Sequence, residues 1–364
     1  MTLAQSNPFY TPERILDECP QMVETPRGRL LIASCRSGNQ LAGKVIACYR
    51  QLLAETGSNG ELLSLPNVDF QFSDSETCVR LEKAVNGNDV FLFQALLDPA
   101  NHAAIDQNYM AFLVAARAFR EWGANQITGI LPYLAYARQD KPTRFEREPT
   151  TVKLMADLTS KAGIGRLVTY DPHGASVQGF YEPTTVYELD PLTLFKEAFH
   201  HFRGQQDVIV VAPDAGAAKL VTHFGRMMDL KSAIASKHRP KPEEAVISEI
   251  IGDFSGKKIA IVLDDMISSG GTVEEVIKKL VQEKGIQEIH LGVSHNLGLP
   301  EARERLLALH EQYGLQQLVV TNSIPQTEAF RQLPFCKIRD LSETFARVIN
   351  RIHHNRPVSE LFSM

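Results

Sequence analysis

The chain has 364 residues, of which 44% are apolar and 22% are charged, and its length predicts two domains rather than a single core. It carries a formal net charge of −5 and has no segment apolar enough to span a bilayer, which argues against nucleic-acid and membrane partners. Five scattered cysteines, never spaced Cys-x-x-Cys, indicate reduced thiols in the cytoplasm and argue against a disulfide framework or a zinc site.

The first 28 residues are polar, contain four prolines and lack the apolar core of a signal peptide, so they are interpreted as a surface extension. After them, short apolar runs alternate with helical patterns. Strands are expected at Leu30–Ala33, Val68–Phe72, Val90–Phe93, Gln126–Leu131, Leu167–Tyr170, Val208–Ala212, Ile259–Leu263, Glu288–Val293 and Gln317–Thr321. Helices are expected at Asn39–Ala54, Ile105–Trp122, Thr150–Ala162, Ala217–Met228, Val273–Glu283 and Pro300–Tyr313.

This alternation of nearly continuous apolar strands with helices predicts an α/β fold of mostly parallel sheets flanked by helices. The pattern runs twice and breaks around residues 188–204. We therefore expect an N-terminal α/β domain over residues 29–188 and a similar C-terminal one over residues 189–364. In this prediction the last helix of the chain can pack against the first domain.

Polar and ionisable residues come directly after four of the expected strands, and in parallel α/β sheets ligands bind at the carboxyl ends of the strands. The four segments are Pro132–Lys141, Asp171–Gly174, Pro213–Gly216 and Asp264–Thr272. One such coincidence is weak, but four of them predict a ligand site.

The segment Asp264–Thr272 is the most specific of the four. Its Ser-Ser-Gly-Gly-Thr turn lets backbone amides approach an anion closely, and the start of the next helix adds a favourable dipole. The paired Asp264 and Asp265 suit the vicinal hydroxyls of a ribose or a magnesium ion. The alternative is an ordinary strand–turn–helix connection. The stretch resembles the phosphoribosyl-diphosphate loop shared by phosphoribosyltransferases and phosphoribosyl diphosphate synthetases, and alone it does not separate the two.

Each remaining motif has an ordinary explanation when it is taken alone. Arg138–Asp140 fits a solvated helix start, His173 a surface histidine, and Asp214 a helix cap. Lys237–Arg239 fits a charged loop. The segment Gly252–Lys258 is too short for a Walker motif and precedes a strand, so nucleotide binding there is rejected. The order of the motifs along the chain, rather than any one of them, favours a function.

Taken in order, the motifs resemble ribose-phosphate pyrophosphokinases, also called phosphoribosyl diphosphate synthetases, from about residue 30 to about residue 340. The matching segments are Phe72-Ser-Asp74-Ser75-Glu76, Pro132-Tyr133 with Tyr136-Ala-Arg138-Gln139-Asp140, Asp171-Pro-His173 with Val177-Gln-Gly-Phe180, Pro213-Asp214-Ala-Gly216, Ser236-Lys237-His238-Arg239-Pro240 and Asp264–Thr272. The resemblance implies two phosphoribosyltransferase-type domains. It also implies transfer of the diphosphoryl group of ATP to ribose 5-phosphate, with Mg²⁺, for nucleotide biosynthesis.

The resemblance assigns roles residue by residue. For ATP it implies Phe72, Asp74, Glu76, Arg138, Gln139 and Asp140, the first three reaching the adenine from a neighbouring subunit. For ribose 5-phosphate it implies Asp214, Asp264, Asp265, Ser268, Ser269, Gly270, Gly271 and Thr272. Its implied metal ligands are Asp171, His173 and Asp214, and its catalytic residues are Lys237 and Arg239 on a mobile, exposed loop over Lys237–Glu244.

The implied assembly is a cytoplasmic homo-oligomer built from dimers, with a hexamer as one form. Three residues depart from the usual family pattern: Ser268 stands for an aspartate, His238 for an arginine and Ser75 for a glycine. They leave the substrate class intact but open the questions of phosphate activation, ADP inhibition and hexamer assembly. Two alternatives stay open, a non-catalytic regulatory paralogue of a synthetase and a phosphoribosyltransferase.

Overall fold

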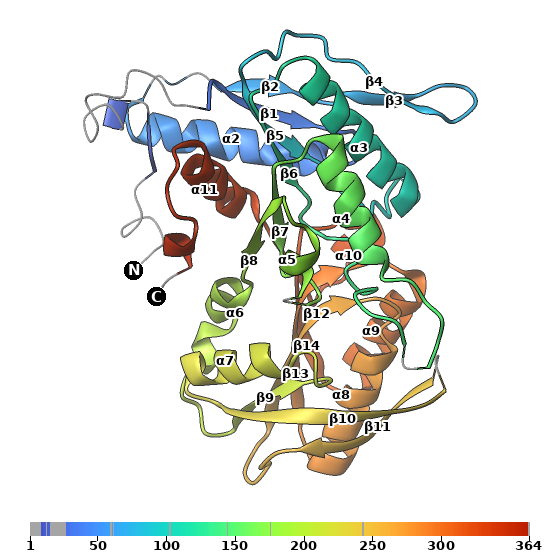
Figure 1. Ribbon diagram of the computed structural model, residues 1–364. Coiled ribbons are helices and arrows are strands. Elements are labelled where there is room, and N and C mark those ends of the chain that lie inside the picture. Colours follow the sequence, from blue (N-terminus) through green and yellow to red (C-terminus); the bar gives the residue numbers. More distant parts are fainter. Residues whose placement is uncertain are drawn as a thin grey trace. The chain divides into compact units, whose positions relative to one another are not determined.

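The computed structural model describes residues 9–11, 13–14, 27–58, 60, 62–101, 103–143, 145–174, 176–241 and 244–362 (Figure 1). The chain divides into two compact units. Unit 1 comprises Met1–Leu189 and Asp340–Met364, and unit 2 comprises Asp190–Arg339. The sequence assigned residues 189–364 to the second domain and expected that the last helix could pack on the first domain. The structure places the whole segment from Asp340 onward in unit 1.

Unit 1 is built on a six-stranded sheet in the order β2-β1-β5-β6-β7-β8, and every neighbouring pair in it is parallel. Its strands are β1 (Leu30–Ser34), β2 (Leu63–Leu65), β5 (Asp89–Phe93), β6 (Gln126–Ile130), β7 (Arg166–Tyr170) and β8 (Thr185–Leu189). Every residue of β1 and β5 is buried, as expected for strands covered on both faces. The apolar runs predicted at β1, β5, β6 and β7 are confirmed.

Helices cover both faces of this sheet (Figure 1). They are α2 (Asn39–Glu55), α3 (Ile105–Glu121), α4 (Thr151–Ala162), α5 (Val177–Phe180) and α11 (Ser342–His353), with a 3₁₀ turn η3 (Ser359–Leu361) near the end. Helices α2 and α11 pack on each other. The ring of Phe345 on α11 meets that of Phe93 on β5 edge to face, which attaches the C-terminal helix to the unit 1 core.

The sequence predicted that the N-terminal segment is a surface extension, but part of this segment is buried. Phe9, Tyr10 and Thr11 are buried. The Tyr10 amide donates to Asn350 Oδ1 (2.7 Å), and Asn350 Nδ2 donates to the Tyr10 carbonyl (2.5 Å) and to Tyr49 Oη (3.1 Å). The buried amide of Asn350 on α11 thus satisfies a backbone segment 340 residues away, and this pairing explains why that stretch is drawn inward.

A separate two-stranded hairpin, β3 (Asp69–Gln71) with β4 (Thr77–Val79), projects from unit 1 (Figure 1). The sequence predicted a strand at Val68–Phe72, and the strand exists but lies outside the parallel sheet. The tip is closed by backbone hydrogen bonds from the Phe72 amide to the Glu76 carbonyl (2.9 Å) and from the Ser75 amide to the Phe72 carbonyl (3.0 Å).

Unit 2 contains a seven-stranded sheet in the order β11-β10-β9-β12-β13-β14-β15. Its strands are β9 (Val208–Ala212), β10 (Lys231–Lys241), β11 (Glu244–Ile251), β12 (Ile259–Ile267), β13 (Glu288–Asn296), β14 (Leu315–Thr321) and β15 (Cys336–Arg339). All pairs are parallel except β10 with β11. The sequence predicted a loop over Lys237–Glu244, and this is wrong for the described backbone, because Lys237–Lys241 continues β10 and pairs with β11.

The helices of unit 2 are α6 (Leu192–Phe199), α7 (Ala218–Met228), α8 (Gly271–Lys284), α9 (Pro300–Gln312) and α10 (Glu328–Arg331), with a 3₁₀ turn η2 (His200–Phe202). Alternate residues of β9 point to opposite faces of the sheet. Ile209 and Val211 join the core under α8 and α9, whereas Val208 and Val210 join the core under α6 and α7. Among the described residues, no helix is both long and apolar enough to cross a membrane.

Candidate active site

In unit 2 the order of the strands changes direction between β9 and β12, because β10 lies on the far side of β9 and β13 on the far side of β12. Ligands of open α/β sheets bind at the carboxyl ends of the strands beside such a switch point. Asp214 comes just after β9, and Asp264 and Asp265 lie near the end of β12. Three of the predicted ribose 5-phosphate residues therefore lie at this switch point.

Strand β12 continues to Ile267, four residues beyond its predicted end, so the two aspartates are on the strand and not in the loop after it. Asp264 is opposite Val293 of β13 in the parallel ladder, and the longer β13 accounts for the extension. The Asp265 amide donates to Asp264 Oδ1 (3.0 Å). This pairing holds the Asp264 carboxyl group in a fixed orientation.

The electrostatics of the switch point are dominated by carboxylates. Burial, with the nearby charges of Asp265 and Asp214, raises the pKa of Asp264 well above its ordinary value. Asp214 also accepts hydrogen bonds from the amides of Gly216 (2.8 Å) and Ala217 (3.4 Å) through Oδ1, so it closes the turn before α7. Asp214 is therefore not the helix cap weighed in the sequence, because Ala217 directly precedes α7 and no side chain of the described residues caps this helix. Sugar hydroxyls that donate to these oxygens would relieve the repulsion.

The glycine-rich loop leads from β12 into α8, as predicted. Gly270 has φ +80°, a conformation that favours glycine, and Gly271 is the first residue of the helix. No side chain of the described chain caps this helix start. Amides at an uncapped helix N-terminus are donors that suit a phosphate. Ser268 and Thr272 are half-buried, and Ser269 is exposed.

The loop has one partner that the sequence did not reveal. Arg305 on α9 donates from Nη1 to the Ser269 carbonyl (2.7 Å). Nothing in the local sequence around Arg305 marks it, because the contact joins two segments 36 residues apart.

In unit 1 three of the predicted ATP residues lie after β6, and two of the predicted metal ligands lie after β7. Arg138 and Gln139 are exposed and Asp140 is half-buried. The Ser176 hydroxyl donates to Asp140 Oδ2 (3.2 Å), which joins the stretch after β6 to the stretch after β7. Asp171 is the residue after β7 and has φ +42°, an uncommon conformation for a residue with a side chain. These two stretches therefore come together in unit 1.

The switch point of unit 1, between β1 and β5, is filled by the unit's own residues. A Cβ atom on Gly38 would lie 2.5 Å from the Phe93 carbonyl oxygen, so the loop after β1 sits tightly on β5. Gln94 is buried and donates to the Asn108 carbonyl (2.8 Å), and the Ser37 hydroxyl donates to Asn108 Oδ1 (3.0 Å).

The other predicted site residues lie on the β3–β4 hairpin and on β10, not at the strand ends described above. Phe72, Asp74 and Glu76 are at the exposed tip of the β3–β4 hairpin, where 51% of the Phe72 surface is accessible. Lys237 and Arg239 lie on β10, and their side chains fall outside the described part of the structure.

The predicted metal ligands are divided between the units: Asp171 and His173 belong to unit 1, and Asp214 belongs to unit 2. No cluster of three or more His, Cys, Asp or Glu side chains that could hold a metal occurs among the described residues. The carboxylates suit magnesium by type, since Mg²⁺ takes few protein oxygens and completes its shell with water and substrate phosphate.

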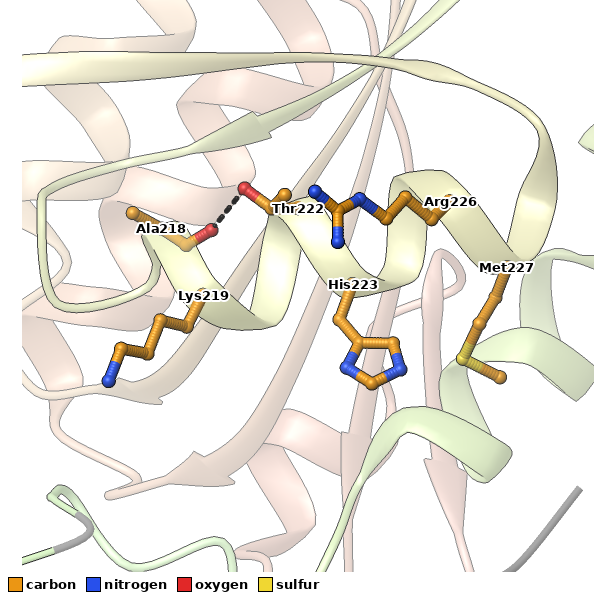
Figure 2. Close-up of a pocket in the computed structure, with 6 residues that line it drawn as sticks. All are labelled: Ala218, Lys219, Thr222, His223, Arg226 and Met227. Carbon is orange, nitrogen blue, oxygen red and sulfur yellow. Dashed lines mark hydrogen bonds between the residues drawn. The ribbon is translucent and has the colours of Figure 1, made fainter.

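A cavity of about 640 Å³ lies on α7, directly after the Asp214 turn, and no residue of the predicted site lines it. Figure 2 shows Lys219, His223 and Arg226 extending from this one helix, which also contributes Ala218, Thr222 and Met227 to the lining. The Thr222 hydroxyl donates back to the Ala218 carbonyl (2.7 Å) and is engaged within the helix. The lining thus places three basic side chains on α7.

Comparison with known proteins matches both halves of the chain. Residues 30–163 match the family model for the N-terminal domain of ribose phosphate pyrophosphokinase, and residues 231–363 match that for the phosphoribosyl synthetase-associated domain. Ribose-phosphate pyrophosphokinase of Clostridium acetobutylicum is 36% identical over 293 residues, which are 80% of this chain and 88% of that relative. The enzyme of the same name from Fusobacterium nucleatum is 36% identical over 305 residues, 83% of this chain and 92% of the relative.

A solved structure is also similar over most of its length. The phosphoribosylpyrophosphate synthetase from Mycobacterium smegmatis superposes with a TM-score of 0.75 at 28% sequence identity, covering 90% of this chain and 99% of that chain. The predicted α/β fold with mostly parallel, helix-flanked sheets is therefore confirmed both by the topology and by this similarity.

Proposed function

This chain belongs to the ribose-phosphate pyrophosphokinase family, and from that premise we propose how its residues divide the reaction. The enzyme transfers the diphosphoryl group of ATP to the anomeric hydroxyl of ribose 5-phosphate, giving 5-phosphoribosyl 1-diphosphate and AMP. The hydroxyl oxygen forms a bond to the β-phosphorus, the bond from that phosphorus to the oxygen of AMP breaks, and the hydroxyl proton is released. Positioning and charge stabilisation do most of the work in such a transfer.

The observation that carries this proposal is the switch point of unit 2, where Asp264 and Asp265 adjoin an uncapped helix start. The two carboxylates accept hydrogen bonds from the ribose hydroxyls. The amides and hydroxyls of Ser268–Thr272 donate to the 5-phosphate. Asp214 orders the turn beside them and faces the same end of the sheet. Serine at position 268 supplies a hydroxyl donor where the family pattern has a carboxylate.

Unit 1 supplies the ATP residues. Arg138 carries the planar fork of donors that suits a phosphate, and Gln139 and Asp140 come next on the stretch that Ser176 joins to the β7 end. The hairpin tip with Phe72, Asp74 and Glu76 is exposed on its own chain, which suits insertion into the ATP site of a second copy. We therefore propose a homo-oligomer built from dimers, with a hexamer as one form, located in the cytoplasm.

Asp171, His173 and Asp214 would hold Mg²⁺, which when bound neutralises charge on the phosphates of ATP. Lys237 and Arg239 contribute positive charge to the transferred group as its negative charge develops. Both residues are on β10, whose first part pairs with β9, the strand that Asp214 follows.

A coupled assay on the purified protein tests the function. The expected products of ATP and ribose 5-phosphate with Mg²⁺ are AMP and 5-phosphoribosyl 1-diphosphate in equal amounts, and formation of ADP instead would contradict the proposal. Absence of turnover alone, with activity gained on mixing with an active synthetase, would indicate a regulatory paralogue. Release of pyrophosphate from 5-phosphoribosyl 1-diphosphate and a free base would indicate a phosphoribosyltransferase.

A further inference from the structure

Arg305 on α9 contacts both the glycine-rich loop and the first turn of α8. Its Nη1 donates to the Ser269 carbonyl at 2.7 Å, and its Nε forms an ion pair with Glu274 Oε2 at 3.0 Å. Glu274 lies in the first turn of α8. One planar guanidinium thus contacts the loop before the helix start and the helix after it.

The carboxylate partner is itself held in place. Lys278 donates to the other oxygen of Glu274 at 2.7 Å, so each carboxylate oxygen has its own cation. About three-quarters of the Glu274 side chain is shielded from solvent, and 37% of the Arg305 side chain is exposed. Partial burial and the fixed geometry of the fork make this arrangement more rigid than a solvated surface pair.

The two glycines of the loop leave the space that α9 needs. A Cβ atom on Gly271 would lie 3.3 Å from Arg305 Nη1, and one on Gly270 would lie 3.5 Å from the Cα of Ala302. Gly270 is required by its φ of +80°, whereas Gly271 is tight chiefly against Arg305. The loop backbone is therefore packed directly against α9, and Arg305 is the polar part of that contact.

We propose that Arg305 is a positioning residue that holds the loop Ser268–Thr272 in the conformation that receives the 5-phosphate of ribose 5-phosphate. The assignment rests on the proposed function of the same loop. A loop ordered before binding does not lose that conformational freedom when the ligand arrives, and this difference strengthens binding. Arg305 acts through the loop and not on the reacting atoms.

The test compares Arg305→Gln with Arg303→Gln in the full-length protein. Arg303 lies on the same helix and donates to the Ala329 carbonyl at 3.3 Å, so its replacement makes the same charge change away from the loop. Isothermal titration calorimetry with ribose 5-phosphate measures binding without turnover. The Kd is expected to rise on the order of 10–100-fold in Arg305→Gln and to stay within about 2-fold of wild type in Arg303→Gln.

Steady-state kinetics separate positioning from general damage. In Arg305→Gln the KM for ribose 5-phosphate rises with the Kd, while the KM for ATP and the kcat at saturating substrates change by less than about 3-fold. Arg305→Lys, which keeps the charge but loses the fork, is expected to fall between wild type and Arg305→Gln. Glu274→Gln weakens the ion pair with Arg305 and is expected to raise the Kd less than Arg305→Gln does. In the double variant the two effects on Kd are expected to be less than additive.

Wild-type affinity in Arg305→Gln would overturn the inference and leave the proposed function standing. An equal rise in the KM for ATP would also overturn it, because that pattern indicates a loss of structure throughout. A wild-type protein that binds no ribose 5-phosphate would instead refute the proposed function, and the inference with it.

Discussion

Replacing Asp264 by asparagine is expected to make the protein more stable at neutral pH while weakening its hold on ribose 5-phosphate. Burial and the carboxylates of Asp265 and Asp214 raise the pKa of Asp264, so the folded state disfavours its charged form. Asparagine has nearly the same shape and keeps the oxygen that accepts from the Asp265 amide. Its amide nitrogen then donates toward carboxylates that previously repelled the side chain.

The size of the gain can be worked from the usual cost of a buried polar group without full compensation, on the order of 1–3 kcal/mol. We expect the free energy of unfolding to rise by about 1–2 kcal/mol above pH 7. For a unit of this size each kcal/mol raises Tm by about 2–4 °C. The Kd for ribose 5-phosphate should rise on the order of 10-fold or more, since a charged acceptor for the ribose hydroxyls is lost.

The pH dependence of the free energy of unfolding tests this prediction most directly. Because the raised pKa lets the folded state keep a proton that the unfolded chain loses near pH 3.8, the wild type loses stability as pH rises from there through the folded pKa. The variant lacks that loss, so its advantage in urea unfolding should grow with pH and then level off. An advantage that is absent at pH 7, or that does not vary with pH, would refute the reasoning.

Asp253 offers a control of opposite sign. Its hydrogen bond with Lys231, together with the Ser255 amide, lowers the pKa of this exposed carboxyl group. Asp253→Asn should therefore lose stability at neutral pH relative to wild type, and the difference should vanish as pH falls toward the folded pKa.

Three further predictions concern other parts of the chain. Lys237→Ala should lower kcat on the order of 10²–10³-fold with unchanged far-ultraviolet circular dichroism, whereas Lys231→Ala on the same strand should not; near-normal turnover in the former would remove Lys237 from the mechanism. Asn350→Leu should cost about 2–4 kcal/mol in urea unfolding, because Tyr10 loses both backbone partners, and protease should then cleave the N-terminal segment faster; an unchanged midpoint would show that the segment contributes nothing. Ser75→Gly should raise Tm slightly, since Ser75 has φ +75° at the hairpin tip; a lower Tm would contradict strain there.

Much of the architecture was accessible from the sequence because it depends on local patterns. The apolar runs of β9 and β12 and the helical pattern of α8 were predicted within a few residues. The strands that were missed are short, amphipathic or at an edge: β2, β4, β8, β10, β11 and β15. Their residues alternate or carry charge, and their strand conformation depends on pairing with a neighbour that the sequence does not identify.

The candidate site shows the same division. The sequence by itself placed Asp214, Asp264 and the Ser268–Thr272 loop at strand ends, because each follows an apolar run that predicts a strand. That prediction used the rule that parallel strands end together. Ser75 could also be noted as a departure from glycine, although its positive φ became evident only in the folded chain.

Only the tertiary structure decided which residues shift one another's pKa and which residues contact one another. The pKa of Asp264 is raised chiefly by burial and also by the charges of Asp265 and of Asp214, which is 50 residues away in the chain. The loop contacts Arg305, 36 residues beyond Ser269. The buried place of Phe9–Thr11 depends on Asn350, 340 residues beyond Tyr10. Local propensity and periodicity carry no information on such contacts, because they form when elements pack and each partner's sequence is compatible with many other neighbours.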